Sequence, residues 1–225
     1  GRILWFFSEA ASFTGREKYR QMARSAYDYL ATYFWDREHE GIYWEIDSQG
    51  RAISERKHVY AQAFAIYGLC AYYKLTGDAA ALAKATRLYT ILESVAHDHD
   101  NEGYIEAFNR DWSRADDFRL SPDEPNSPRS MNAHLHILEA YTALYRVAPD
   151  ADKKSSLRRI VEYFMKYFVD PENFHLRIFL DQDWHDVSTK YSYGHEMEFS
   201  WLLWEAVEAL DDAKLAGPGD LLAEP

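Results

Sequence analysis

The sequence predicts an all-α fold built from repeated helical hairpins. Seven segments are either apolar along one helical face or apolar nearly all round, and the two kinds alternate along most of the chain. A short motif of polar and aromatic residues recurs between the hairpins. Its second copy lies about 62 residues after the first, and its third copy about 72 residues after the second. Repeated units of two helices and a loop are typical of an α/α array. We expect the densely apolar helices to form an inner ring and the amphipathic ones an outer ring; an irregular helical bundle is the alternative.

The predicted helices have recognisable faces and ends. Residues 17–34 place Tyr19, Met22 and Ala26 on one face, whereas residues 58–75 are apolar on nearly every side and are therefore expected to be buried on every side. Glycine or proline residues follow several of the helices and end them. The predicted ranges are 2–12, 17–34, 58–75, 79–96, 131–147, 152–168 and 196–210.

Short alternating segments lie between the hairpins and are expected to form β-hairpins at one end of the array. These segments are Gly41–Ile46, Gly103–Phe108 and His175–Leu180. The proline-containing stretch Asn109–Pro128 is expected to be a functional loop over the same array.

Composition excludes several classes of function. The 225 residues carry 25 basic and 37 acidic side chains, a net charge of −12, which argues against nucleic acid or an anionic membrane as partner. No apolar run reaches the roughly 18 residues that a membrane span needs. The single cysteine, Cys70, excludes an intrachain disulfide framework and fits a reducing compartment. We therefore expect a cytoplasmic protein.

The stretch 131–139 is the most informative part of the sequence. Asn132, His136 and Glu139 fall at helical spacings of i, i+4 and i+7 and share one face of a helix that is otherwise apolar. His134 points about 200° away from His136, so the two cannot ligate one metal together. Three polar groups on one face favour a wet cavity over an ordinary buried histidine.

A second histidine stands at the start of the last predicted helix. His195 and Glu198 are i, i+3 neighbours, so the carboxylate can orient the ring and raise its basicity, as a general acid/base near neutral pH requires. His58 and Gln62 form a similar pair, and Arg2 stands near Trp5. A polar cavity with many aromatic walls suits a neutral sugar, whose hydroxyls need hydrogen bonds and whose C–H faces stack on rings.

Four motifs resemble the cellobiose-epimerising branch of the N-acylglucosamine 2-epimerase superfamily, in order along essentially the whole chain. They are the stretches 2–8 (RILWFFS), 57–64 (KHVYAQAF), 129–141 (RSMNAHLHILEAY) and 192–198 (SYGHEME). The resemblance implies an (α/α)6 barrel. It also implies reversible inversion at C2 of the reducing-end sugar of β-1,4 disaccharides (cellobiose to glucosyl-mannose, lactose to epilactose) through ring opening and a cis-enediolate, with no metal and no cofactor.

The resemblance also implies roles for individual residues. His195 would be one of two acid/base histidines, with Glu198 in support. The sugar would be held by a set of five residues: Arg2, Tyr60, Asn132, His136 and Glu139.

The chain departs from the family in its extent. The family's partner histidine lies in C-terminal helices, and no residue after Leu210 could supply it. We expect residues 1–225 to be a single barrel domain that is incomplete at both ends and holds about half to two thirds of the barrel. A mannose isomerase or N-acylglucosamine 2-epimerase on the same barrel, an (α/α)-barrel glycoside hydrolase, and a non-catalytic carbohydrate-binding fragment remain open.

Overall fold

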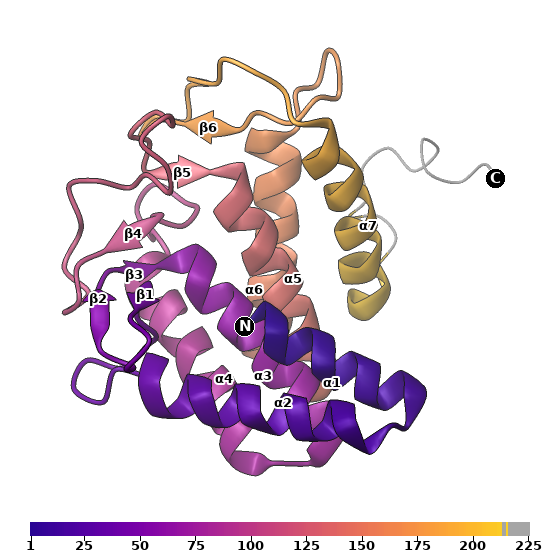
Figure 1. Cartoon of the computed structure of the whole chain (residues 1–225). Helices are drawn as coiled ribbons and strands as arrows, with labels where there is room; N and C mark the ends of the chain where they lie inside the picture. Colours follow the sequence, from indigo (N-terminus) through magenta and orange to yellow (C-terminus); the bar gives the residue numbers. More distant parts are fainter. Residues whose placement is uncertain (213–214, 216–225) are drawn as a thin grey trace.

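The computed structural model describes residues 1–212 and 215 and confirms the all-α class. Each predicted helix is present, with ends close to those expected, and the array is a partial (α/α)6 barrel (Figure 1). The α-helices of the described residues are α1 (Arg2–Thr14), α2 (Glu17–Tyr29), α3 (Val59–Thr76), α4 (Ala79–Ile91), α5 (Met131–Val147), α6 (Ala151–Tyr163) and α7 (Tyr193–Leu210).

Helices α1, α3, α5 and α7 form the inner layer, each packed on the next, and α2, α4 and α6 lie outside them. On α1 and α3, Arg2 contacts Tyr60, and Trp5 stacks on Tyr67 one turn further along α1 and two turns further along α3, with ring centroids 5.4 Å apart. These contacts follow the same direction along both helices, so α1 and α3 are parallel.

Each outer helix ends in the same way. A five-residue π-helical turn follows the α-helix, and these turns are η1 (Leu30–Phe34), η2 (Leu92–Ala96) and η3 (Phe164–Phe168). An aspartate comes two residues later (Asp36, Asp98 and Asp170), and its carboxylate accepts backbone N–H groups of the following turn. The amphipathic pattern therefore extends through the π turn, and the ends predicted for the three outer helices coincide with the ends of these turns.

A glycine closes this turn in the first two repeats. Gly41 and Gly103 both have φ of +74°, a conformation that other residues rarely adopt. A Cβ atom added at either glycine would lie 2.6 Å from a ring carbon of Trp112 or Trp184, respectively. Each tryptophan belongs to the next repeat, so neighbouring repeats pack directly against each other at these glycines.

In the described part of the chain, six short strands lie at the end of the array where the inner helices begin (Figure 1). Antiparallel pairing joins β1 with β2, β3 with β4 and β5 with β6. The first pair is a local hairpin, whereas the other two pairs connect neighbouring repeats and fasten the starts of α3 and α5. The strands are β1 (Glu45–Ile46), β2 (Ala52–Ser54), β3 (Lys57–His58), β4 (Ala107–Phe108), β5 (Arg129–Ser130) and β6 (Phe179–Leu180).

A buried ion pair supports the same end. Lys57 Nζ lies 2.9 Å from Asp36 Oδ2, and both side chains are fully buried. Arg110 Nε lies 3.0 Å from the same oxygen. Burial alone would raise the pKa of Asp36, but the hydrogen bonds from Arg110 and Lys57 hold it well below its usual range. The first repeat and the loop of the second are thus joined through a charged aspartate.

The stretch Asn109–Pro128 contains no helix, as the sequence predicts, and it lies at the strand-bearing end. Among the described residues, no helix combines the length and the apolar character that crossing a membrane would take.

Candidate active site

The first turn of α5 separates two histidines with different surroundings. His134 is fully buried: its Nδ1 bonds the Ser130 carbonyl at 2.8 Å and its Nε2 accepts the Tyr104 N–H at 3.0 Å. Burial lowers the pKa of His134 to about 3. Both ring nitrogens are used within the core, so His134 is a structural residue.

His136 faces the other side of α5, as its spacing predicts. Its Nδ1 lies 3.0 Å from Glu139 Oε2, and because a carboxylate accepts, Nδ1 carries the proton and Nε2 is left as the free nitrogen. The ring packs on two aromatic side chains of α3: its centroid lies 4.3 Å from that of Phe64 and 5.1 Å from that of Tyr60. The predicted grouping of His136 with Glu139 is therefore present.

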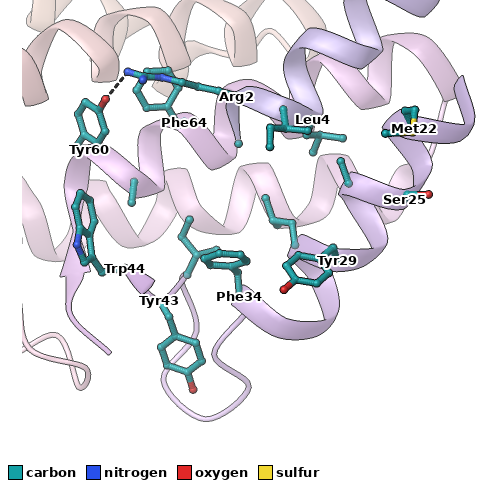
Figure 2. A pocket seen from close by; sticks show the side chains of 16 residues that line it. Arg2, Leu4, Met22, Ser25, Tyr29, Phe34, Tyr43, Trp44, Tyr60 and Phe64 are labelled. Atoms are coloured by element: carbon teal, nitrogen blue, oxygen red, sulfur yellow. Dashed lines mark hydrogen bonds between the residues drawn. The ribbon is translucent and has the colours of Figure 1, made fainter. Parts of the chain in front are cut away.

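Arg2 joins this group from α1. Its guanidinium donates a hydrogen bond to the Tyr60 hydroxyl and lies over the Phe64 ring at 4.1 Å from the centroid (Figure 2). Trp44 stands beside Tyr60, with ring centroids 6.4 Å apart. A cation, a phenol and an indole thus meet at the start of α1 and α3.

His195 approaches from the first turn of α7. Its Nδ1 lies 2.6 Å from the Ser192 hydroxyl, three residues earlier, just before the helix begins. The expected direct bond to Glu198 is absent among the described side chains, and Glu198 instead acts through its charge. Burial and the neighbouring His136 lower the pKa of His195, and Glu198 opposes them. The ring is therefore neutral at neutral pH, the state in which it can accept a proton.

The predicted site residues come together from all four inner helices. Besides acting on His195, Glu198 raises the pKa of Tyr60 together with Glu139, although burial is the larger cause and Arg2 opposes the shift. Asn132 lies half-buried at the start of α5, and within the described part of the chain its amide makes no hydrogen bond. An amide without partners at this position is free to bind a ligand.

His58 and Gln62, which the sequence pairs on one face of α3, bind different partners in the structure. Gln62 uses its whole amide on the backbone of Ile42, accepting from the N–H and donating to the carbonyl, each at 2.8 Å. His58 turns instead toward the loop, with Nε2 3.1 Å from the Phe118 carbonyl. Both side chains are structural in this arrangement.

A groove of about 650 Å³ runs along α1, α2 and the start of α3 (Figure 2). Arg2, Tyr60 and Trp44 stand at one end of it, and the remaining lining is mostly apolar, with Leu4 and Phe34 among it. His136 and His195 do not line this groove. The groove therefore meets the site at its Arg2 and Tyr60 end, whereas its apolar part along α1 and α2 lies away from the two histidines.

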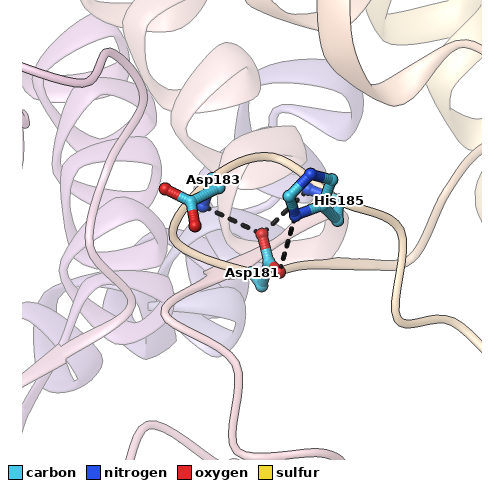
Figure 3. A group of neighbouring side chains, drawn as sticks. All are labelled: Asp181, Asp183 and His185. Carbon is cyan, nitrogen blue, oxygen red and sulfur yellow. Dashed lines mark hydrogen bonds and ion pairs between the residues drawn. The ribbon is translucent and has the colours of Figure 1, made fainter.

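Asp181, Asp183 and His185 bring potential ligand atoms within 4.8 Å of one another on an exposed turn (Figure 3). The Asp181 carboxylate accepts the backbone N–H groups of Asp183 and His185 at 2.9 and 2.8 Å, and it pairs with the His185 ring at 3.1 Å. These bonds form an ordinary capped turn, which accounts for the cluster without a metal.

Ser192, Phe64 and Trp44 lie at the site and were not predicted as members of it; the positions of the first two follow from helical spacing. Ser192 occupies the position before a helix, three residues from His195, where a hydroxyl commonly meets the first turn. Phe64 lies four residues after Tyr60 and so shares its face. Both spacings were visible in the sequence.

The sequence pattern of N-acylglucosamine 2-epimerases (GlcNAc 2-epimerases) matches residues 1–218. The chain belongs to this family. It is 44% identical over 214 residues to a cellobiose 2-epimerase from Bacteroides fragilis, and that match covers 95% of this chain and 55% of the relative. A cellobiose 2-epimerase from Dictyoglomus turgidum is 37% identical over 214 residues, covering 95% of this chain and 54% of the relative. The chain thus spans about half the length of the curated relatives it matches.

Solved structures agree with this membership. The cellobiose 2-epimerase of Bacillus thermoamylovorans superimposes with a TM-score of 0.92 at 37% identity, over 96% of this chain and 56% of that structure. A D-mannose isomerase (TM-score 0.73, 19% identity) and a family 76 glycoside hydrolase from Bacteroides thetaiotaomicron (TM-score 0.72, 16% identity) share the fold alone. These likenesses confirm the helical barrel class.

Proposed function

We propose that this chain supplies the sugar site of a 2-epimerase, which inverts C2 of the reducing-end sugar of β-1,4-linked disaccharides such as cellobiose or lactose. The arrangement of two histidines supports this most directly. His136 lies close enough to His195 to lower its pKa, and each histidine has Nδ1 hydrogen-bonded within the protein, to Glu139 and Ser192 respectively. Two free Nε2 atoms can therefore face one ligand.

His195 would act as an acid/base group. In the tautomer in which Nδ1 donates to the Ser192 hydroxyl, Nε2 holds the lone pair that would remove the C2 proton of the open-chain aldehyde. The electrons of the C–H bond form the C1–C2 double bond of a cis-enediolate, and the aldehyde oxygen takes the negative charge. Rotation about the C2–C3 bond then presents the other face of C2 to the second acid/base histidine, which the family has in its C-terminal helices; this acid would give its proton to C2 and so invert the centre, while His195 keeps the proton that it removed. Glu198 would favour the protonated ring that exists between these two steps.

The other five residues, Arg2, Tyr60, Asn132, His136 and Glu139, would hold the sugar. Arg2 can stabilise the developing oxyanion because its guanidinium is held in place by Tyr60 and Phe64 before substrate arrives. Asn132 and His136 offer an amide and an imidazole to hydroxyl groups. Glu139 would fix the tautomer of His136 and thereby set which of its nitrogens meets the sugar.

The test is proton exchange at C2 of cellobiose and lactose in deuterated water, using the intact protein. Deuterium at C2 together with the C2 epimer is the expected result. His195→Ala is expected to slow both by about 10²- to 10⁴-fold while sugar binding persists. His185→Ala changes an exposed histidine on a surface turn and is expected to leave exchange unchanged, so it is the matched control.

Other products would decide against the proposal. Ketose formation, with the proton returned to C1, would indicate an isomerase of the mannose type. Release of glucose from cellobiose would indicate a hydrolase, in which Glu139 and Glu198 would have to flank the scissile bond as the two carboxyl groups. Glu139 already bonds His136, which favours an orienting role. Binding of both sugars by the intact protein without exchange would leave a carbohydrate-binding function.

A further inference from the structure

A buried chain of polar groups links the loop Asn109–Pro128 to the start of α3. His58 is 1% exposed, and its Nε2 lies 3.1 Å from the Phe118 carbonyl. A carbonyl only accepts, so Nε2 carries the proton and donates it. His58 Nδ1 makes no hydrogen bond and faces Glu106 Oε1 at 3.7 Å.

Glu106 continues this chain to the start of α5. The carboxyl group is 3% exposed, and its Oε2 accepts the Ser130 hydroxyl at 2.5 Å. Ser130 caps α5 by accepting the Ala133 N–H at 3.0 Å. Glu106 Oε1 is therefore the oxygen left to face His58.

His58 Nδ1 and Glu106 Oε1 face each other at 3.7 Å, slightly beyond hydrogen-bond distance, so a small approach would let one proton bridge them. Without it, a buried carboxylate would face a bare nitrogen lone pair, and both would lack a partner. Burial raises the pKa of Glu106 to about 8 and lowers the pKa of His58 to about 4, so the proton stays on the pair at neutral pH. The charged groups that act on the pair are Arg56, Asp117, Glu124 and the carbonyl dipole of Phe118.

Residues 56–58 also bind the loop 109–128 through hydrogen bonds to three successive backbone carbonyls. Arg56 donates to the carbonyls of Asp117 and Arg119, and His58 donates to that of Phe118 between them. Residues 56–58 run directly into α3, where Tyr60 joins Arg2. On its other side, the His58 ring packs against Trp44, with centroids 5.1 Å apart.

We propose that His58 and Glu106 are positioning residues: they share one proton and thereby fasten the loop 109–128 to the starts of α3 and α5. Tyr60 follows His58 by two residues, and Asn132 follows Ser130 by two. The pair thus sets the position of two side chains of the site without touching the sugar. The link to sugar binding rests on the proposed function, whereas the fastening of the loop does not.

Hydrogen–deuterium exchange of peptides from residues 109–128, corrected for the intrinsic effect of pH on exchange, tests the fastening without any substrate. When the loop opens, Glu106 regains its ordinary pKa near 4.5 and His58 its ordinary pKa near 6.5. Between about pH 5 and 6.5, opening of the loop releases the proton of Glu106 and lets His58 take one up. The net proton change is zero, so the protection of the loop amides against exchange is expected not to vary with pH in this range. Between pH 6.5 and 8, opening only releases the Glu106 proton, and protection is expected to fall about tenfold per pH unit.

Three variants sharpen the test. Glu106→Gln can donate to His58 and accept from Ser130, so it is expected to keep the loop protected and to remove the fall between pH 6.5 and 8. His58→Phe keeps a ring beside Trp44 but loses the bond to Phe118, so loop protection is expected to drop at every pH. Asp123→Asn removes a loop carboxylate that is outside the chain of bonds, and it is expected to behave as wild type.

Protection of the wild-type loop that does not change between pH 6.5 and 8 would overturn the proposal. So would an unchanged pH dependence in Glu106→Gln, or full loop protection in His58→Phe with the peptides of α3 and α5 intact. The affinity for cellobiose is expected to weaken in step with loss of loop protection. If the loop responds as described and cellobiose does not bind, the proposed function fails while the positioning pair stands.

Discussion

The variant Ser192→Ala tests how much the orientation of the His195 ring contributes to the rate of epimerisation. The Ser192 hydroxyl lies 2.6 Å from Nδ1, and both side chains are half-buried. A hydrogen bond of this kind contributes about 1 kcal/mol net, and about 1.4 kcal/mol corresponds to tenfold in rate. Removing it is therefore expected to lower kcat for cellobiose epimerisation about fivefold with little change in KM. Loss of the imidazole itself in His195→Ala should cost about 10²- to 10⁴-fold.

The assay is the initial rate of epimer formation by the intact protein, measured over a range of cellobiose concentrations. Ser192→Thr keeps the hydroxyl and is expected to recover most of the rate. Ser200→Ala is the matched control, because that hydroxyl lies on the same helix and bonds only the Glu196 carbonyl, at 3.0 Å. A Ser192→Ala variant that is as active as wild type would refute the reasoning, since the ring would then be oriented by something other than Ser192.

Three further predictions concern charge and burial. Asp36→Ala leaves the buried Lys57 ammonium without its partner and is expected to cost about 3–5 kcal/mol in urea unfolding; a loss below about 1 kcal/mol would contradict this. Because the pKa of His195 lies below 6.5 and the neutral ring is the base, kcat/KM should rise with pH along a limb centred below pH 6.5, and a limb above that value would exclude His195 as this base. His134→Ala orphans the Tyr104 N–H and is expected to cost about 1–3 kcal/mol of stability, with kcat unchanged in the molecules that remain folded; a specific loss of kcat would contradict its structural role.

The helices could be predicted because their signal is local. Helical spacing of apolar residues reports burial turn by turn, and it identified all of α1 to α7 in the described chain. The π turns could not be distinguished from α-helix, because one extra residue in the turn still leaves Leu30, Leu92 and Phe164 buried. Pairing of β3 with β4 and of β5 with β6 was also out of reach, since two-residue strands carry almost no pattern and their partners lie about 50 residues away.

The site was predicted best where one helix carries several of its residues. The i, i+3 spacing of His136 and Glu139 fixes their contact whatever surrounds the helix. The hydrogen-bond partner of His195 was harder to predict, because Ser192 and Glu198 are both three residues from it, one before it and one after it in the sequence. The start of α7 decides between them, because the turn before the helix brings the Ser192 hydroxyl to Nδ1.

The inner helices also shape the electric field at the site. Each α-helix carries a partial positive charge of about half a unit at its start. Arg2, Asn132 and His195 each lie in the first turn of an inner helix, α1, α5 and α7 respectively. The outer helices bring negative ends to the same side, but about one helix diameter (about 10 Å) further out, where their influence is weaker. In a chain with a net charge of −12, the helix starts therefore offset part of the negative charge that Glu139 and Glu198 bring to the site, and the backbone would help Arg2 to stabilise an anion formed there.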